Sequence, residues 1–214
     1  MKLKTHISSI LETKAEHLIK VVLIRKGESL ANASGLLCGW LDPKLSINGR
    51  TQANALMPVL FPSRRVFKSI YSSDLQRCVN FADITLGFNG VIGDKLLKTD
   101  ARLREINFGD QEGVNYDLLR DNEKKAIDSF EYQAPNGESW TNVKSRFTEL
   151  ISQLDSNGTH CIYTHGGTIC SLTYNIGIED VIPPASVVGL LYNKEDPIAS
   201  EIMFYWPYDS EQVI

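Results

Sequence analysis

The sequence has no long apolar run and no excess of basic residues. Lys and Arg number 22 against 26 Asp and Glu, for a formal net charge of -4. A general nucleic-acid surface would need a basic face, so this class is not favoured. No apolar stretch approaches the roughly 20 residues of a membrane span, and residues 1–6 lack the apolar core of a secretory signal. We expect a soluble, cytoplasmic protein without nucleic-acid or membrane partners.

Cysteine and histidine are also scarce. The chain has 4 of each, and no two cysteines have the Cys-x-x-Cys spacing. The acids and histidines show no spacing typical of metal ligands. We therefore expect reduced thiols, no metal and no cofactor.

Short apolar segments alternate with helical patterns along most of the chain. With 214 residues, 43% of them hydrophobic, the chain is long enough for one sizeable core. The expected strands lie at 21–24, 69–73, 161–164, 187–192 and 202–206, and the expected helices at 5–19, from 47 to about 56, from 74, and from 140 to about 154. The second of these helices should stop before Pro58 and Pro62. Ser46, Asp74 and Ser139 should cap the second, third and fourth helices. The alternation predicts an α/β domain with a mainly parallel sheet.

Two regions stand apart from this alternation. We interpret residues 1–19 as a helical extension packed on the domain. A mitochondrial presequence is the alternative, but it should be poor in acids, and Glu12 and Glu16 occur here. Within the single domain at 20–214, residues 101–139 are polar and irregular and contain the turn at 135–137. We interpret them as an insertion that covers a site.

Polar groups follow three of the expected strands. Arg25 and Lys26 end the first, residues 72–77 with Arg77 follow the second, and His165 follows the third. In a parallel sheet such groups gather outside the carboxyl ends of the strands, and helix starts there favour an anion. Each group alone has an ordinary explanation, such as a surface ion pair or a packed histidine. Together, with two forked arginine donors, they predict a phosphoryl-binding site.

Six motifs occur in a fixed order, at residues 21–32, 40–53, 71–77, 103–113, 135–139 and 164–167. This set resembles the histidine phosphatase superfamily, also called phosphoglycerate-mutase-like, over residues 21–206. The resemblance implies a three-layer α/β/α sandwich around a mainly parallel central sheet. It is closer to the phosphatase branch, because Glu105 is followed by Ile-Asn-Phe-Gly, whereas the mutases carry Arg-His-Tyr-Gly there and a longer insertion.

The resemblance also implies roles for individual residues. The phosphoryl oxygens would be bound by Arg25, Arg77 and His165, with Asn32 on the rim and Gly166 allowing close approach of the backbone. Glu105 would be the general acid that protonates the leaving oxygen. Lys26 stands where the family has its nucleophilic histidine.

Lysine at this position alters the expected chemistry. An amine attacks phosphorus only when unprotonated, and a free lysine has a pKa of about 10.4. Neighbouring Arg25 and Arg77 would lower the pKa of Lys26, but a bound phosphate dianion would raise it again. We therefore expect a phosphomonoester hydrolase by descent that binds phosphate and turns over slowly or not at all.

Three hypotheses account for Lys26. The chain is an engineered variant of a protein with histidine there, or a natural pseudophosphatase that senses or scaffolds a phosphorylated metabolite or phosphoprotein. In the third, lysine is an alternative nucleophile or assists attack by water. The protonation argument favours the first two. Phosphoglycerate mutase activity is a lesser alternative, and nothing in the sequence specifies an oligomeric state.

Overall fold

A six-stranded sheet forms the centre of the computed structural model, which describes residues 2–88 and 96–209. In chain order its strands are β1 (Ile19–Arg25), β2 (Ser69–Ser72), β3 (Leu97–Thr99), β4 (Thr159–Thr164), β5 (Val187–Tyr192) and β6 (Glu201–Trp206). Their spatial order is β3-β2-β4-β1-β5-β6. β1, β2, β3 and β4 pair in parallel, and β5 is antiparallel to both β1 and β6. The expected α/β fold with a mainly parallel sheet is confirmed.

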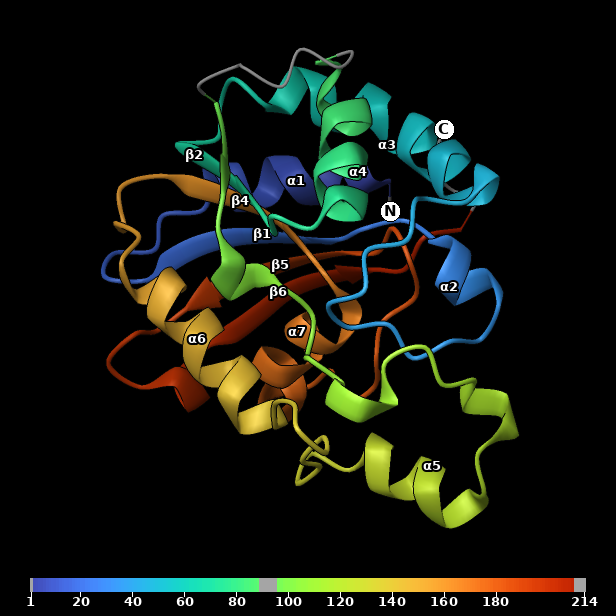
Figure 1. Ribbon diagram of the computed structural model, residues 1–214. Helices are drawn as coiled ribbons and strands as arrows, with labels where there is room; N and C mark the ends of the chain where they lie inside the picture. Colours follow the sequence, from blue (N-terminus) through green and yellow to red (C-terminus); the bar gives the residue numbers. More distant parts are fainter. Residues whose placement is uncertain (1, 89–95, 210–214) are drawn as a thin grey trace.

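Helices cover both faces of the sheet (Figure 1). One face carries α1 (Leu3–Glu12), α3 (Ile47–Ser63) and α4 (Gln76–Leu86), and the other carries α6 (Trp140–Ser152) and α7 (Gly166–Thr173). β1 shows why both layers form. Its side chains alternate, so that Val22 and Ile24 join the core under α3 while Val21 and Leu23 join the core under α6. All four are fully buried, as expected for a central parallel strand.

Shorter elements complete the fold. They are α2 (Leu30–Ala33), α5 (Asp121–Asp128), and the 3₁₀ turns η1 (Ala101–Leu103), η2 (Gly109–Gln111), η3 (Tyr116–Leu118), η4 (Tyr174–Ile176) and η5 (Pro197–Ala199). Residues 101–139 have a small apolar cluster of their own, which includes Ile106, Phe108 and Ile127 and packs against Val143 of α6. This cluster packs the insertion, which contains α5, against α6 and Leu37 (Figure 1).

The N-terminal helix is shorter than its sequence pattern predicts. α1 ends at Glu12, and the chain then turns through His17, whose φ is 69°. Lys20 donates from Nζ to the carbonyl of Thr13 at 2.9 Å, next to the end of the helix. Leu3, Ile7 and Ile10 are buried in the main core, so α1 is packed on the domain although the predicted range of 5–19 is wrong.

α3 shows the opposite error, because it runs through both prolines. Pro58 and Pro62 are exposed, so the carbonyls that lose a helical partner face water. On the opposite face, Leu56, Val59 and Leu60 remain buried. Burial of this apolar face on both sides of Pro58 outweighs the roughly 3 kcal/mol that an interior proline costs.

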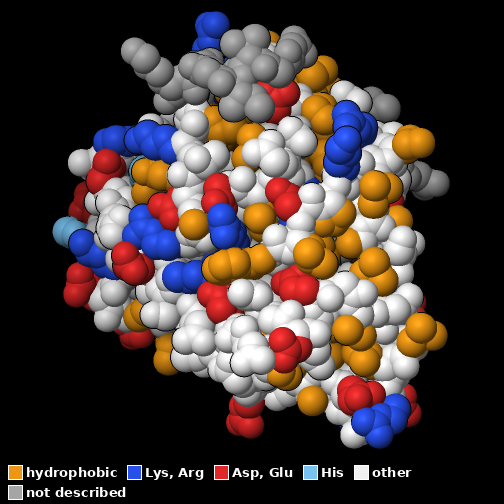
Figure 2. All heavy atoms as spheres, viewed as in Figure 1, with side chains coloured by type: hydrophobic (Ala, Val, Ile, Leu, Met, Phe, Trp, Pro, Cys, Tyr) orange, Lys and Arg blue, Asp and Glu red, His pale blue; other side chains and the backbone are white. Residues whose placement is uncertain are grey.

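The surface shows no large region of one charge on the face in Figure 2, where basic and acidic side chains are interspersed. No helix of the described residues is both long and apolar enough to cross a bilayer.

Candidate functional site

Three adjacent strands end side by side at the predicted site. Arg25 at the end of β1 pairs in register with Thr164 at the end of β4, and β2 lies on the other side of β4. The residues that follow these strand ends, Lys26, His165 and Ser73, therefore meet at one edge of the sheet. Parallel pairing brings together groups that lie up to 139 positions apart in the chain.

Most of the charge at this edge is buried. Lys26, Arg77 and His165 are only 4%, 1% and 1% exposed, and Arg25 is half-buried. Buried cations are unfavourable unless they are paired or hydrogen-bonded. Their hydrogen bonds therefore show which donors remain for a ligand.

Lys26 is held by the loop that follows β1. Its Nζ donates to Oδ1 of Asn32, and the same oxygen accepts from Ser29 N at 3.1 Å and Ser29 Oγ at 2.9 Å. Ser29 in turn caps α2 in a capping box with Asn32. The amine is thus fixed at the start of α2, and Asn32 links it to the rim of the site.

Arg25 is only partly satisfied by the protein. Its Nη1 donates to the carbonyl of Ile182, whereas its buried Nε has no hydrogen-bond partner among the described residues. Gly166 lies against this guanidinium, because a Cβ at Gly166 would be 2.7 Å from Cζ of Arg25 and 2.7 Å from Val181. The structure thus places Gly166 where the backbone closely approaches Arg25. Arg25, Lys26, Arg77 and His165 together are called the cationic group below.

Arg77 is fixed by the loop before α3. Its Nη2 donates to the carbonyl of Gly39 at 2.5 Å, and its Nη1 donates to the carbonyl of Leu41 and lies 3.3 Å from Oδ1 of Asp42. Asp42 also accepts from the backbone N–H groups of Gln76 and Arg77. One carboxylate therefore caps α4 and holds Arg77 in place.

The surroundings of His165 favour its neutral form. Burial first, and then the charges of Arg77, Lys26 and Arg25, hold its pKa well below the usual value. Its Nε2 lies 2.9 Å from Oγ of Ser73, while Nδ1 is buried without a partner among the described residues. If the Ser73 hydroxyl donates to Nε2, the neutral ring carries its proton on Nδ1. That N–H is then available to a ligand oxygen.

Lys26 has a strongly altered protonation equilibrium. Burial, then the charges of Arg25 and Arg77, lower its pKa from 10.5 to about 7. A lysine beside two arginines has few anions to compensate it, and only Cys38 and Glu105 act in the opposite direction. A bound anion would supply the missing negative charge.

Glu105 lies beside the cationic group, on the insertion. Its Oε2 accepts from the backbone N–H of Gly167 at 3.0 Å, and its Oε1 lies 3.4 Å from Oγ1 of Thr168. Arg146 of α6 donates to the carbonyls of Arg104, at 2.6 Å, and Glu105, at 3.0 Å. The start of α7 therefore holds the carboxylate, and Arg146 holds the backbone of Glu105.

The predicted residues are thus together, and they leave buried nitrogens for an anion. The charges of Arg25 and Arg77 act on both Lys26 and His165, and Glu105 acts on Lys26 and Arg25. The described residues contain no cluster of three or more His, Cys, Asp or Glu side chains that could hold a metal ion. All four cysteines are free thiols.

Comparison with known proteins gives the lineage. The family model described as the histidine phosphatase superfamily (branch 1) matches residues 21–197. The chain belongs to this superfamily. A 2,3-bisphosphoglycerate-dependent phosphoglycerate mutase of Bartonella tribocorum is 34% identical over 198 residues, covering 85% of this chain and 96% of the relative. A glucosyl-3-phosphoglycerate phosphatase of Mycolicibacterium vanbaalenii is 32% identical over 168 residues, covering 72% of each chain.

The solved structures agree with this assignment. The crystal structure of a phosphoglycerate mutase from Thermus thermophilus superposes with a TM-score of 0.72 at 27% identity, covering 89% of this chain and all of the other. Superfamily relatives thus include both mutases and a phosphatase.

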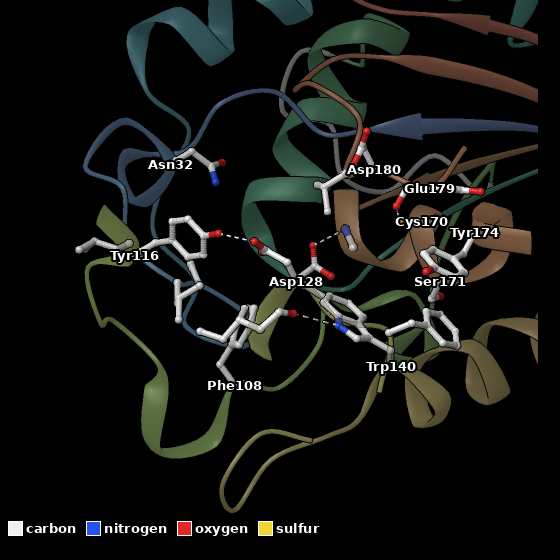
Figure 3. A pocket seen from close by; sticks show the side chains of 18 residues that line it. Asn32, Phe108, Tyr116, Asp128, Trp140, Cys170, Ser171, Tyr174, Glu179 and Asp180 are labelled. Atoms are coloured by element: carbon white, nitrogen blue, oxygen red, sulfur yellow. Dashed lines mark hydrogen bonds between the residues drawn. The ribbon is translucent and has the colours of Figure 1, made fainter. Parts of the chain in front are cut away.

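A cavity of about 490 Å³ adjoins the cationic group. Asn32, Glu105 and Gly167 line it. Asn32 accepts from Lys26, and Glu105 accepts from the N–H of Gly167 at the start of α7. Figure 3 shows Phe108 and Tyr116 on one side of this cavity and Ser171 and Tyr174 on the other. Residues between 105 and 130 of the insertion, with Trp140 of α6, therefore form one wall. α7 and η4 form the opposite wall.

One predicted role is wrong and several supporting residues were missed. Asp74 does not cap α4; instead it forms a salt bridge with Arg104, with Nε at 2.7 Å from Oδ1. The cap comes from Asp42, which lies far away in sequence. Ser73 and Arg146 also have roles that the sequence reasoning did not assign. Ser73 lies inside the 71–77 motif, four residues before Arg77, and this motif could have marked it.

Proposed function

We propose that this protein binds phosphate monoesters at the group formed by Arg25, Lys26, Arg77 and His165, and that Lys26 limits its hydrolysis of them. The observation that carries the proposal is the pair of buried nitrogens, Arg25 Nε and His165 Nδ1, that lack partners among the described residues. Buried polar atoms are nearly always satisfied. A phosphoryl group presents several oxygens and a negative charge, and so would satisfy these nitrogens and compensate the cations.

The reaction that this site would favour is hydrolysis with Glu105 as general acid. Glu105 lies at the border between the cationic group and the cavity, where the alcohol oxygen of a monoester would lie. Attack of water on phosphorus would form the new bond as the bond to the alcohol oxygen breaks, and the proton from Glu105 would let that oxygen leave as the alcohol, with inorganic phosphate as the other product. The ligand would be a small phosphorylated metabolite or a phosphoprotein, and the free thiols fit a reducing compartment such as the cytoplasm.

Lys26 is the reason to expect impaired turnover. In the ligand-free protein its pKa of about 7 leaves much of the amine neutral. A phosphate dianion beside the amine raises that pKa, because the anion stabilises the ammonium form. The ammonium has no lone pair with which to attack phosphorus, so the substrate would suppress the nucleophile as it binds.

A second candidate follows from the same pKa. Lysines next to other cations act as nucleophiles in enzymes because their pKa is lowered, and Lys26 meets this condition before substrate binds. In this case Lys26 would form a phosphoramidate that water then hydrolyses. Phosphoglycerate mutase activity is a lesser candidate, supported only by the names of relatives.

Release of p-nitrophenol from p-nitrophenyl phosphate separates these candidates. We expect the chain with Lys26 to be at least 100-fold slower than Lys26→His, since covalent catalysis needs an unprotonated nucleophile. Binding of inorganic phosphate to both proteins, measured by calorimetry, is the control for an intact site. Robust turnover by the chain with Lys26 that Lys26→Met abolishes would overturn the impaired-site proposal in favour of a lysine nucleophile. Absence of phosphate binding to both proteins would overturn the whole proposal.

A further inference from the structure

The cavity beside the cationic group has an aromatic lining. Phe108, Tyr116, Phe130, Trp140 and Tyr174 all line it. Phe130 and Tyr174 stack with ring centroids 4.8 Å apart, so the insertion and η4 are in direct contact there. Aromatic walls provide a large contact area for an apolar or planar group.

The charged side chains that line the same cavity are all acidic. Besides Glu105, they are Asp128, Glu179 and Asp180, and none of the described lining residues is Lys or Arg. Glu179 and Asp180 lie just before Val181, and Figure 3 shows both at the top of the view beside Cys170. After burial, the charges of Glu105, Asp180 and Glu179 raise the pKa of the Cys170 thiol to about 11. A negative potential therefore reaches the interior of the cavity.

The positive and negative parts of the site are separated. The cations lie at or just after the strand ends, whereas the exposed acids Asp128 and Glu179–Asp180 lie at the end of α5 and in the segment after η4. A monoester whose phosphoryl group met Arg25 would direct its alcohol towards this aromatic and acidic space. A carboxylate or second phosphate on that alcohol would face carboxylates with no compensating cation among the described lining residues.

We propose that the cavity binds the alcohol part of the monoester, and that this alcohol is aromatic or bulky and apolar and carries no negative charge. This inference rests on the phosphoryl-binding function proposed above. It separates the chain's ligand from phosphoglycerates, which carry a carboxylate next to the phosphorylated carbon chain. Phe130, Trp140 and Tyr174 would contact the alcohol, while Glu179 and Asp180 would reject anionic alcohols.

Three phosphonates, which cannot be hydrolysed at the carbon–phosphorus bond, test the proposal by calorimetric titration of the full chain. Methylphosphonate measures the phosphoryl site alone. Benzylphosphonate adds an aromatic group, and we expect it to bind about tenfold more tightly because the ring is removed from water. 4-Carboxybenzylphosphonate adds one negative charge to the same shape, and we expect it to bind about fivefold more weakly than benzylphosphonate at low salt.

A charge-neutral variant with nearly the same shape identifies the cause. Glu179→Gln combined with Asp180→Asn should strengthen binding of 4-carboxybenzylphosphonate about threefold at low salt and change binding of benzylphosphonate less than twofold. Glu131→Gln is the matched control, since Glu131 is an exposed acid that does not line the cavity, and it should change neither value.

The possible results separate the two proposals. Equal affinities for methylphosphonate and benzylphosphonate, or tighter binding of the carboxylated probe, would overturn the inference and leave the phosphoryl site standing. If no probe bound, and inorganic phosphate also failed to bind, the proposed function itself would fall and the inference with it. Discrimination that persisted unchanged in the double variant would overturn the role given to Glu179 and Asp180.

Discussion

Replacement of Lys26 by methionine should stabilise the ligand-free protein. A pKa lowered from 10.5 to about 7 means that the folded state disfavours the charged amine by roughly 5 kcal/mol, at about 1.4 kcal/mol for each pH unit. Methionine has a similar length and no charge, and Asn32 Oδ1 keeps its two hydrogen bonds from Ser29 when the amine is lost. Allowing for relaxation around the site, we expect a gain of about 3 kcal/mol in the free energy of unfolding at pH 6.

The pH dependence gives this prediction its sign. In the folded protein Lys26 loses its proton as the pH rises through about 7, whereas the unfolded chain keeps the proton up to about 10.5. The stability of the chain with Lys26 therefore rises with pH between pH 7 and 10.5, because the unfolded state binds more protons there. Lys26→Met lacks this gain. Its advantage should be greatest below pH 7 and should shrink as the pH rises towards 10.5.

Thermal unfolding in phosphate-free buffers at pH 6 and pH 9 measures the effect. At pH 6 the midpoint of Lys26→Met should exceed that of the chain with Lys26 by at least about 5 °C, since 1 kcal/mol corresponds to about 2–4 °C at this chain length. Lys125→Met, at an exposed position on α5, is the control and should show no pH-dependent difference. A Lys26→Met protein that was less stable than the chain with Lys26 at pH 6, or equally shifted at both pH values, would refute the reasoning.

Three further results are expected. First, the affinity for inorganic phosphate should fall as the pH rises above 7 in the chain with Lys26 but not in Lys26→Met, because the anion binds the protonated amine of Lys26 preferentially; parallel calorimetric profiles would contradict this. Second, Glu105→Gln in the Lys26→His background should lower hydrolysis of an alkyl phosphate about 100-fold and that of p-nitrophenyl phosphate much less, since only the alkoxide needs protonation to leave; equal losses would remove Glu105 as general acid. Third, Asp42→Ala should lower the free energy of unfolding in urea by about 2–4 kcal/mol, because it removes the cap of α4 and the carboxylate partner of buried Arg77; a change below about 0.5 kcal/mol would show that water or another group replaces it.

Local sequence patterns were sufficient where the structure depends on neighbours along the chain. The apolar run at 21–24 followed by Arg25 predicts β1 and the delivery of charge to a strand end, and both are found. Ser46 and Ser139 cap α3 and α6 as expected, because the residues that make these bonds lie three positions apart. The motif order predicts the superfamily, which the family match confirms.

The errors arise where distant contacts replace local ones. Pro58 predicts the end of a helix by its own chemistry, but the buried face of α3 continues beyond it. Asp74 has the right position in the sequence for a cap. In the structure it pairs with Arg104, and Asp42, from another loop, caps α4 instead. The aromatic lining of the cavity could not be predicted either. Phe130 and Tyr174 are separated in sequence by α6, β4 and α7, and only the tertiary fold brings their rings together.

The most direct test of the phosphoryl site is a crystal structure of this chain grown or soaked with tungstate, an electron-dense analogue of phosphate. The account predicts one tungstate within hydrogen-bonding distance of Arg25 Nε and His165 Nδ1, next to Lys26 Nζ and Arg77. Ordered tungstate elsewhere with this position empty, or Arg25 Nε and His165 Nδ1 paired to protein groups in the presence of the anion, would contradict the central claim.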